Sequence, residues 1–303
     1  MTAISDVPSG RSRSTVVVAV GVPRDVADVW RMLTEPDEVA GWFGDLSEPL
    51  ATGGIARLDF RDGDFFTLHD VVAEPPRYLR YAWRFLGTGP VNTITWRVKA
   101  VAGGSWVTVT DEDARRSADE STQLEEGWLD FTERLTRFAR TGASARYDWR
   151  REFDGSIELP GTPNTVWALL FAPGQAAEWL PIQSADLVNG TLFTLSDGQE
   201  PSALAVSAGA AAPPCDLQFE LSHPSWDHAT SCHISLNDRK SGTLLSLSQR
   251  GWEYISSRPT VQRSQRERLS RVWINALQRA LQLVRNRAGV LDESASGGLA
   301  DVL

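Results

Sequence analysis

The residue types that most often perform chemistry are sparse in this sequence and follow no catalytic spacing. His223, His228 and His233 recur every five residues. A strand would put such residues on alternating faces, and the first two stand in a segment with a proline, so we predict no metal site. No nucleophile elbow, phosphate-binding loop, dinucleotide fingerprint or zinc-type cysteine spacing is present, so the sequence predicts no catalytic residue and no cofactor.

The acidic run 111–113, the two cysteines and His233 can each be explained by a structural role as well as by a functional one. The acidic run 111–113 is interpreted as a solvated turn, because its counterpart at 249–251 carries the opposite charge. Cys215 and Cys232 have no neighbouring feature that would activate a thiol, so we interpret both as buried or bystander residues. His233 stands in a predicted strand, where it either contacts a ligand or is a satisfied or exposed side chain.

The aromatic residues, which include twelve tryptophans, carry more information. Tyr81, Trp83 and Trp96 fall on the apolar face of predicted strands, and Trp128 meets them from a predicted helix. Four converging rings either fill a core or wall a pocket that stacks on a planar guest. The predicted ligand-binding set is Trp42, Phe60, Phe66, Tyr81, Trp83, Trp96, Trp128, Phe131, Trp179, Phe193, Phe219, His233 and Trp273.

These side chains would be positioned by a sheet that is covered on one face and by a long helix, and the sequence pattern predicts both. Alternation of apolar and polar residues, typical of antiparallel strands covered on one face, occurs at 55–61, 65–73, 78–85, 92–100 and 105–111. Apolar residues at steps of four and three predict an amphipathic helix through Leu124, Trp128, Phe131, Leu135 and Phe138.

The whole pattern occurs twice, so the chain is a duplicated domain rather than a solenoid. Trp30, Pro36 and Trp42 in the first copy correspond in spacing to Trp167, Pro173 and Trp179 in the second. We interpret Trp30 and Trp167 as core, and Trp42 and Trp179 as core or cavity mouth. The predicted fold class is α+β, with two tandem domains at 14–140 and 152–288, a linker at 141–151 and a disordered tail at 289–303.

Charge and hydropathy exclude some partners. The net charge of −9 is the wrong sign for nucleic acid or an anionic membrane. The apolar run 16–22 is too short to span a bilayer. Arginines such as those at 263–271 are interpreted as solvated helix faces. With two cysteines and no visible signal peptide, the expected location is the cytoplasm. The oligomeric state stays open.

The motifs resemble a known family. The first copy has Val-Trp-x-x-Leu-Thr-x-Pro followed by Trp-Phe at 29–43, Pro-Pro-x-x-Leu-x-x-x-Trp at 75–83 and Gly-Gly-x-x-Val-x-Val at 103–109. This series is similar to the Hsp90-ATPase-activator-homologue group of the START/Bet v 1-like helix-grip superfamily, over 15–140 and more loosely over 153–286. The resemblance implies a curved antiparallel sheet around a long C-terminal helix, with two short helices after the first strand and a cavity between sheet and helix. Similar proteins occur in antibiotic pathways, including enediyne biosynthesis and self-resistance.

Three functions are compatible with that fold. The first is binding of a hydrophobic or polycyclic small molecule, the second a polyketide cyclase or aromatase, and the third an Hsp90-type co-chaperone. A dry cavity lining would favour the binder, converging polar groups the enzyme, and a broad exposed apolar patch the co-chaperone. The first domain is expected to be the binder because it has more aromatic wall. The alternative places the chemistry in the second domain, at His233, Trp252 and Tyr254.

Overall fold

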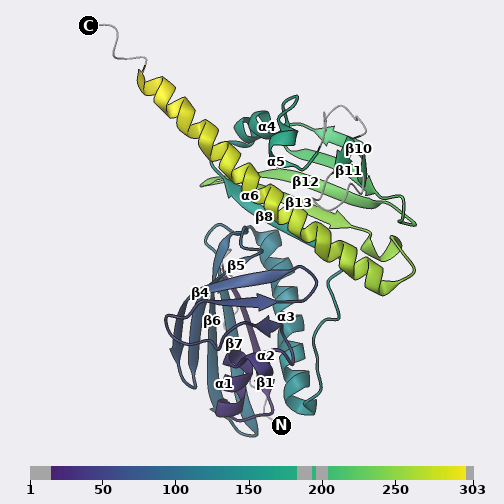
Figure 1. Cartoon of the computed structure of the whole chain (residues 1–303). Coiled ribbons are helices and arrows are strands. Elements are labelled where there is room, and N and C mark those ends of the chain that lie inside the picture. Colours follow the sequence, from purple (N-terminus) through teal and green to yellow (C-terminus); the bar gives the residue numbers. More distant parts are fainter. Residues whose placement is uncertain (1–14, 183–192, 196–203, 298–303) are drawn as a thin grey trace. The chain divides into compact units, whose positions relative to one another are not determined.

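The computed structural model describes residues 15–182, 193–195 and 204–297. Two sheets, each accompanied by one long helix, contain most of the regular structure (Figure 1). Among the described residues, no helix is long and apolar enough to cross a membrane.

The first repeat forms a seven-stranded sheet in the order β1-β7-β6-β5-β4-β3-β2. β7 pairs antiparallel with both β1 and β6, and α3 packs against β1. The elements agree with the predicted strands and helices to within a few residues. They are β1 (Thr15–Val22), α1 (Val26–Thr34), α2 (Pro36–Val39), β2 (Asp45–Leu46), β3 (Ala56–Asp59), β4 (Phe65–Glu74), β5 (Tyr78–Phe85), β6 (Val91–Val101), β7 (Gly104–Glu112) and α3 (Ala118–Thr141).

The second repeat repeats this plan. Its described strands form a six-stranded sheet in the order β8-β13-β12-β11-β10-β9, antiparallel throughout. Each repeat is therefore a helix-grip domain. The elements are β8 (Phe153–Leu159), α4 (Pro163–Phe171), α5 (Ala176–Trp179), β9 (Phe193–Leu195), β10 (Leu204–Ala212), β11 (Asp216–Ser222), β12 (Thr230–Arg239), β13 (Gly242–Arg250), η1 (Trp252–Tyr254) and α6 (Pro259–Gly297).

Side-chain caps fix where the helices begin. The Asp25 carboxylate accepts a hydrogen bond from the Asp28 amide at 2.8 Å, and the Thr162 hydroxyl accepts one from the Thr165 amide at 3.3 Å. Ser117 and Glu120 form a reciprocal capping box at the start of α3. Because these caps satisfy amide groups that have no partner within the helix, the sequence itself sets each helix start.

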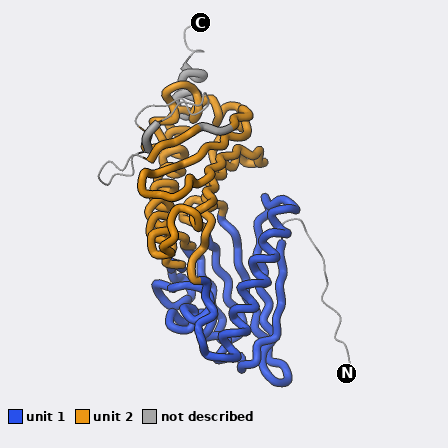
Figure 2. The backbone as a smooth tube through the Cα atoms, turned by 90° about the vertical axis from the view of Figure 1, so that its right-hand side faces the viewer, with its two compact units in different colours: residues 1–58, 67–83, 91–147 blue, residues 59–66, 84–90, 148–303 orange. Residues whose placement is uncertain are grey.

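The chain divides into two compact units whose limits differ from the sequence-based domains (Figure 2). Unit 1 contains residues 1–58, 67–83 and 91–147; unit 2 contains 59–66, 84–90 and 148–303. The segments 59–66 and 84–90 come from the first repeat in sequence. They belong to unit 2 because Leu86, with no exposed surface, is part of its hydrophobic core and Phe65 packs against that core.

The last helix is longer than the sequence predicts. The sequence predicts a disordered tail from residue 289, whereas α6 continues to Gly297. The segment after Arg287 contains no proline, and its Ala, Leu and Glu residues favour a helix. Residues 298–303 of the predicted tail lie outside the described residues.

Candidate ligand-binding site

Seven aromatic side chains of unit 1 form one cluster between the sheet, the short helices and α3. Trp83 and Trp128 stack with ring centroids 5.3 Å apart, and Trp96 meets Trp128 edge-on at 5.5 Å. Phe43 contacts Phe131 at 4.6 Å. The predicted convergence of rings from strands and helix is therefore present. We call Trp42, Phe43, Tyr81, Trp83, Trp96, Trp128 and Phe131 the aromatic cluster.

A small void lies against the aromatic cluster and has a volume of about 10 Å³. That volume is close to the minimum that holds one water molecule. The walls of the void are Leu33, Val39, Trp42, Phe43, Leu46, Leu50, Leu58, Leu68, Tyr81 and Trp96.

Two of the three polar side chains in this wall, Tyr81 and Trp96, contact each other. The Trp96 indole N–H donates to the Tyr81 hydroxyl oxygen at 3.0 Å. Burial raises the pKa of Tyr81, and the nearby Asp111 charge adds to the rise, while the hydrogen bond from Trp96 opposes it. The phenol is therefore neutral and keeps its proton.

The interpretation of Asp111 as part of a solvated turn is wrong. The residue is fully buried, and its carboxylate accepts hydrogen bonds from Trp128 Nε1 at 3.0 Å and Asn92 Nδ2 at 3.3 Å. Arg116, which is 8% exposed, forms an ion pair with the same carboxylate. Burial raises the pKa of Asp111, and Arg116 opposes that rise. Strand alternation carried the missed signal, because Val107, Val109 and Asp111 share one face of β7.

In the second repeat, the tryptophan of the long helix donates its hydrogen bond to an uncharged residue. Trp273 Nε1 donates to Gln249 Oε1 at 2.7 Å, and Gln249 Nε2 donates to Thr230 Oγ1 at 2.7 Å. Gln249 stands in β13 where Asp111 stands in β7. In both repeats, a strand side chain that points into the core accepts a hydrogen bond from the tryptophan of the long helix. This acceptor is a charged residue, Asp111, in the first repeat and an uncharged residue, Gln249, in the second.

Trp42 and Trp179 are core residues that lock the short helices. Trp42 Nε1 donates to Met32 O at 2.8 Å, and Trp179 Nε1 donates to Leu170 O at 3.1 Å. The two indoles thus satisfy carbonyls in the last turns of α1 and α4. Trp42 also lines the void, so it serves as core and as cavity wall.

For Phe60 and Phe66 the ligand-binding role stays a prediction. Both belong to unit 2, where Phe66 contacts Phe60 at 6.0 Å and Phe85 at 5.0 Å. β3 ends at Asp59, and Arg61 takes a left-handed conformation with φ 60°. The alternation of β3 therefore does not extend to Phe60.

The aromatic residues predicted for the second repeat are mostly core. Phe219 is 3% exposed, Trp179 has no exposed surface and Trp273 is 1% exposed, with Phe219 and Trp273 in edge contact at 6.4 Å. Phe193 pairs with Val206 in the sheet, but its side chain lies outside the described residues. Trp252 is fully buried while Tyr254 is 62% exposed, so these two do not form one site.

His233 lies on the outer face of its sheet, away from the buried Cys232 and Ile234 on either side of it. Its Nε2 is 2.7 Å from Asp216 Oδ1, in a pair whose side chains are 41% and 45% exposed. The ligand role predicted for His233 therefore finds no support in its position. The described residues contain no group of three potential metal-binding side chains. Burial raises the pKa of the Cys232 thiol, which makes it unreactive.

We expect His233→Ala to change the free energy of unfolding by less than about 1 kcal/mol, because exposed ion pairs contribute little. Chemical denaturation of the full chain measures this. Gln218→Ala, on the same outer face opposite His233, is the matched control. A loss of ligand affinity in His233→Ala alone would contradict its assignment as a surface residue.

A larger hollow of about 650 Å³ lies on the surface of unit 1, beside the start of α1 and the β6–β7 turn. Its walls include Pro23, Arg24, Pro76 and Val101. Of the described residues, Arg24 is the one positively charged residue that lines this hollow, and its Nε donates to Ala139 O at 2.7 Å. We find no convergent polar groups there that would orient a ligand.

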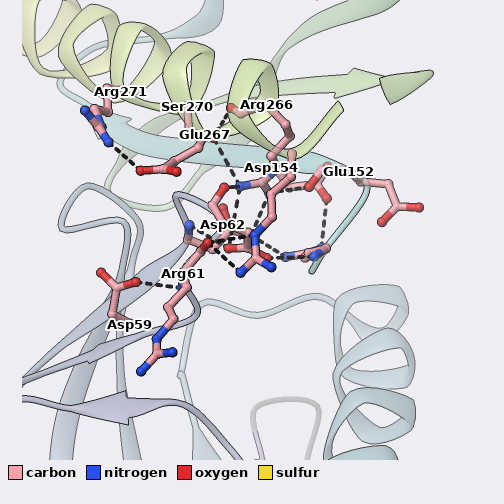
Figure 3. Close-up of polar contacts among 12 residues, drawn as sticks. Asp59, Arg61, Asp62, Glu152, Asp154, Arg266, Glu267, Ser270 and Arg271 are labelled. Atoms are coloured by element: carbon pink, nitrogen blue, oxygen red, sulfur yellow. Dashed lines mark hydrogen bonds and ion pairs between the residues drawn. The ribbon is translucent and has the colours of Figure 1, made fainter. Parts of the chain in front are cut away.

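Buried charges also occur in unit 2. We call Arg266, Asp62, Asp64 and Ser270 the Arg266 cluster. Figure 3 shows Arg266 with Asp62 and Ser270. Arg266 has no exposed surface; its guanidinium donates to Asp64 Oδ2 and Asp62 O, both at 2.7 Å, and to Ser270 Oγ at 3.1 Å. Burial raises the pKa of Asp64, and Arg266 opposes that rise. The interpretation of Arg266 as part of a solvated helix face is therefore wrong, because the 59–66 segment covers it.

The family-model comparison gives the identification. The model described as activator of Hsp90 ATPase homolog 1-like protein matches residues 24–140 and again 160–282. The chain belongs to this family. The family model of the Hsp90 ATPase activator homolog 1-like proteins matches each of the two helix-grip repeats once. This confirms the family resemblance seen in the sequence motifs and the tandem arrangement of the repeats.

Solved structures extend the comparison. DynU16, described as a protein in the dynemicin biosynthetic locus, is 35% identical with a TM-score of 0.80, and the match covers 89% of this chain and 99% of that one. StfQ, the di-domain ARO/CYC from the steffimycin biosynthetic pathway, is 13% identical with a TM-score of 0.37, covering 90% and 99%. CalU16 from Micromonospora echinospora is 19% identical with a TM-score of 0.35, covering 42% and 77%. No curated protein matches the chain.

Proposed function

We propose that this chain binds a hydrophobic or polycyclic small molecule in its first repeat, in natural-product biosynthesis or self-resistance of the polyketide or enediyne kind. The observation that carries the proposal is the likeness to DynU16, which has 35% identity over nearly the whole of both chains. The dynemicin locus is a biosynthetic one, and a shared two-repeat fold at that identity supports a role in the same kind of pathway.

The void supports binding more than catalysis. All but three of its ten walls are aliphatic or phenylalanine side chains. The polar atoms of Tyr81 and Trp96 are bonded to each other, and the Trp42 indole donates to Met32 O. General acid–base chemistry needs titratable groups at the reacting atoms. Asp111 and Arg116 are buried in their own ion pair and are not part of the void's wall. We therefore favour a binder over a cyclase or aromatase.

A polycyclic ligand needs more than 10 Å³, so part of the wall must move. Phe43, Leu46 and Leu50 lie in the segment between α2 and β3, whose only strand is the two-residue β2. The Leu50 amide is held by one hydrogen bond, to Thr34 O at 3.0 Å. Ser47 N–H also donates to Arg57 O at 2.9 Å, and Asp45 pairs with Arg146 at 2.7 Å. Segments outside the long strands still open at lower cost than the interior of the sheet. We place the movable wall there.

Titration of the full chain with planar polycyclic compounds, followed by tryptophan fluorescence, tests this proposal. We expect binding to the natural chain and at least about a tenfold loss in Leu46→Phe, because added bulk in a filled core competes with the ligand. Leu129→Phe makes the same change at a side chain that is 53% exposed on α3, and it should bind normally. No binding by any compound, or equal binding by both variants, would overturn the proposal, and turnover of a compound would favour the enzyme.

A further inference from the structure

The Tyr81 hydroxyl has a hydrogen-bonding capacity that the protein does not use. The side chain is 3% exposed and lines the void. Among the described residues its one hydrogen-bond partner is Trp96 Nε1. An indole nitrogen only donates, so it engages the phenol oxygen as an acceptor and leaves the phenol proton without a partner. A buried donor with no acceptor is costly, and such groups are rare in native proteins.

The helix-grip fold itself does not require this donor. In the second repeat, Phe219 stands in place of Tyr81 and Ile234 in place of Trp96, and both are buried. The same strands pair and the same sheet forms around these two apolar residues. The unpaired donor of the first repeat is therefore better explained by something that binds there than by packing.

The surroundings of the hydroxyl define what could accept its proton. The void has room for one oxygen atom, but a bound water needs two to four polar partners. The indole N–H groups of Trp42 and Trp96 already donate to other atoms. No arginine, lysine or histidine lines the void, so a negatively charged oxygen would be buried without a counter-ion. A neutral oxygen attached to an apolar body fits these conditions.

We infer that Tyr81 determines ligand specificity in the first repeat, by donating a hydrogen bond to a neutral carbonyl or quinone oxygen of the bound polycycle. This inference rests on the proposed function and names the ligand's chemical class. The oxygen lies beside Tyr81 and Trp96 on the sheet, and the apolar body lies toward Phe43, Leu46 and Leu50. The second repeat, with Phe219, has no hydroxyl at the matched position and is not expected to make this selection.

Fluorenone and fluorene form a suitable pair of probes, because these flat tricyclic molecules differ by one carbonyl oxygen. We expect the full natural chain to bind fluorenone about tenfold more tightly than fluorene, as a buried hydrogen bond would produce. Tyr81→Phe should remove this preference and leave the fluorene affinity within about twofold, since the ring is unchanged. Tyr78→Phe is the matched control, because Tyr78 is on the same strand, is only half-buried and does not line the void.

An infrared measurement reports the hydrogen bond directly. The carbonyl stretch of bound fluorenone should lie at lower frequency in the natural chain and in Tyr78→Phe than in Tyr81→Phe. Unchanged near-ultraviolet circular dichroism verifies that the variants are folded. Equal binding of both probes by the natural chain, or an unchanged preference in Tyr81→Phe, would overturn the inference and leave the proposed function standing. Binding of neither probe by a chain that binds other planar polycyclic compounds would overturn the inference alone, and no binding of any compound would overturn both.

Discussion

Arg266→Met is expected to lower the free energy of unfolding by about 3–5 kcal/mol, which is the usual cost of removing one partner from a buried ion pair. Asp62 and Asp64 are 1% and 2% exposed, so neither carboxylate can recover its lost partner by turning to water. Methionine keeps the approximate length of the side chain and leaves little cavity. Urea denaturation of the full chain, followed by circular dichroism, measures the change.

The Arg266 cluster also provides its own controls. Arg271→Met makes the same change one turn along α6, at a side chain that is 71% exposed and paired with Glu267, and should cost less than about 1 kcal/mol. The double variant Arg266→Met with Asp64→Leu should be more stable than Arg266→Met alone, because it leaves one fewer buried charge unpaired. Equal losses in Arg266→Met and Arg271→Met would show that the buried pair contributes nothing.

Asp111→Ala is expected to cost about 3–5 kcal/mol, for the same reason, in unit 1. The change leaves the buried Arg116 without its counter-ion and the Trp128 indole without its acceptor. Glu112→Ala, at the adjacent exposed position, is the control and should change stability by less than about 0.5 kcal/mol. Thermal and urea unfolding of the full chain measure both.

A conservative variant separates the two contributions of Asp111. Asp111→Asn keeps an oxygen that can accept from Trp128, as Gln249 does from Trp273, but it removes the partner charge of Arg116. Its stability should therefore lie between that of Asp111→Ala and that of the natural chain. A loss in Asp111→Asn equal to that in Asp111→Ala would assign the whole effect to the ion pair.

The repeated spacing of Trp30, Pro36 and Trp42 at Trp167, Pro173 and Trp179 was sufficient to predict the two repeats. Local periodicity was sufficient to predict the strands and the long helices. Period-two alternation at 78–85 put Leu79, Tyr81 and Trp83 on one buried face, as the structure has them. Four-three spacing put Trp128 on the face of α3 that meets the sheet. These features depend on neighbours within a few positions, so the backbone geometry of a single element determines them. The same reasoning, applied consistently along β7, would have turned Asp111 inward.

Long-range packing determined the rest. Alternation predicts which way a side chain points, but it does not predict the volume of a void beside several packed rings, which is about 10 Å³ next to the aromatic cluster. Nor can spacing show that 59–66 packs within unit 2 and encloses Arg266, because that contact joins residues about 200 positions apart. The unpaired proton of Tyr81 is visible only when every neighbour of the hydroxyl is known, because hydrogen-bond satisfaction is a property of the assembled core rather than of any segment.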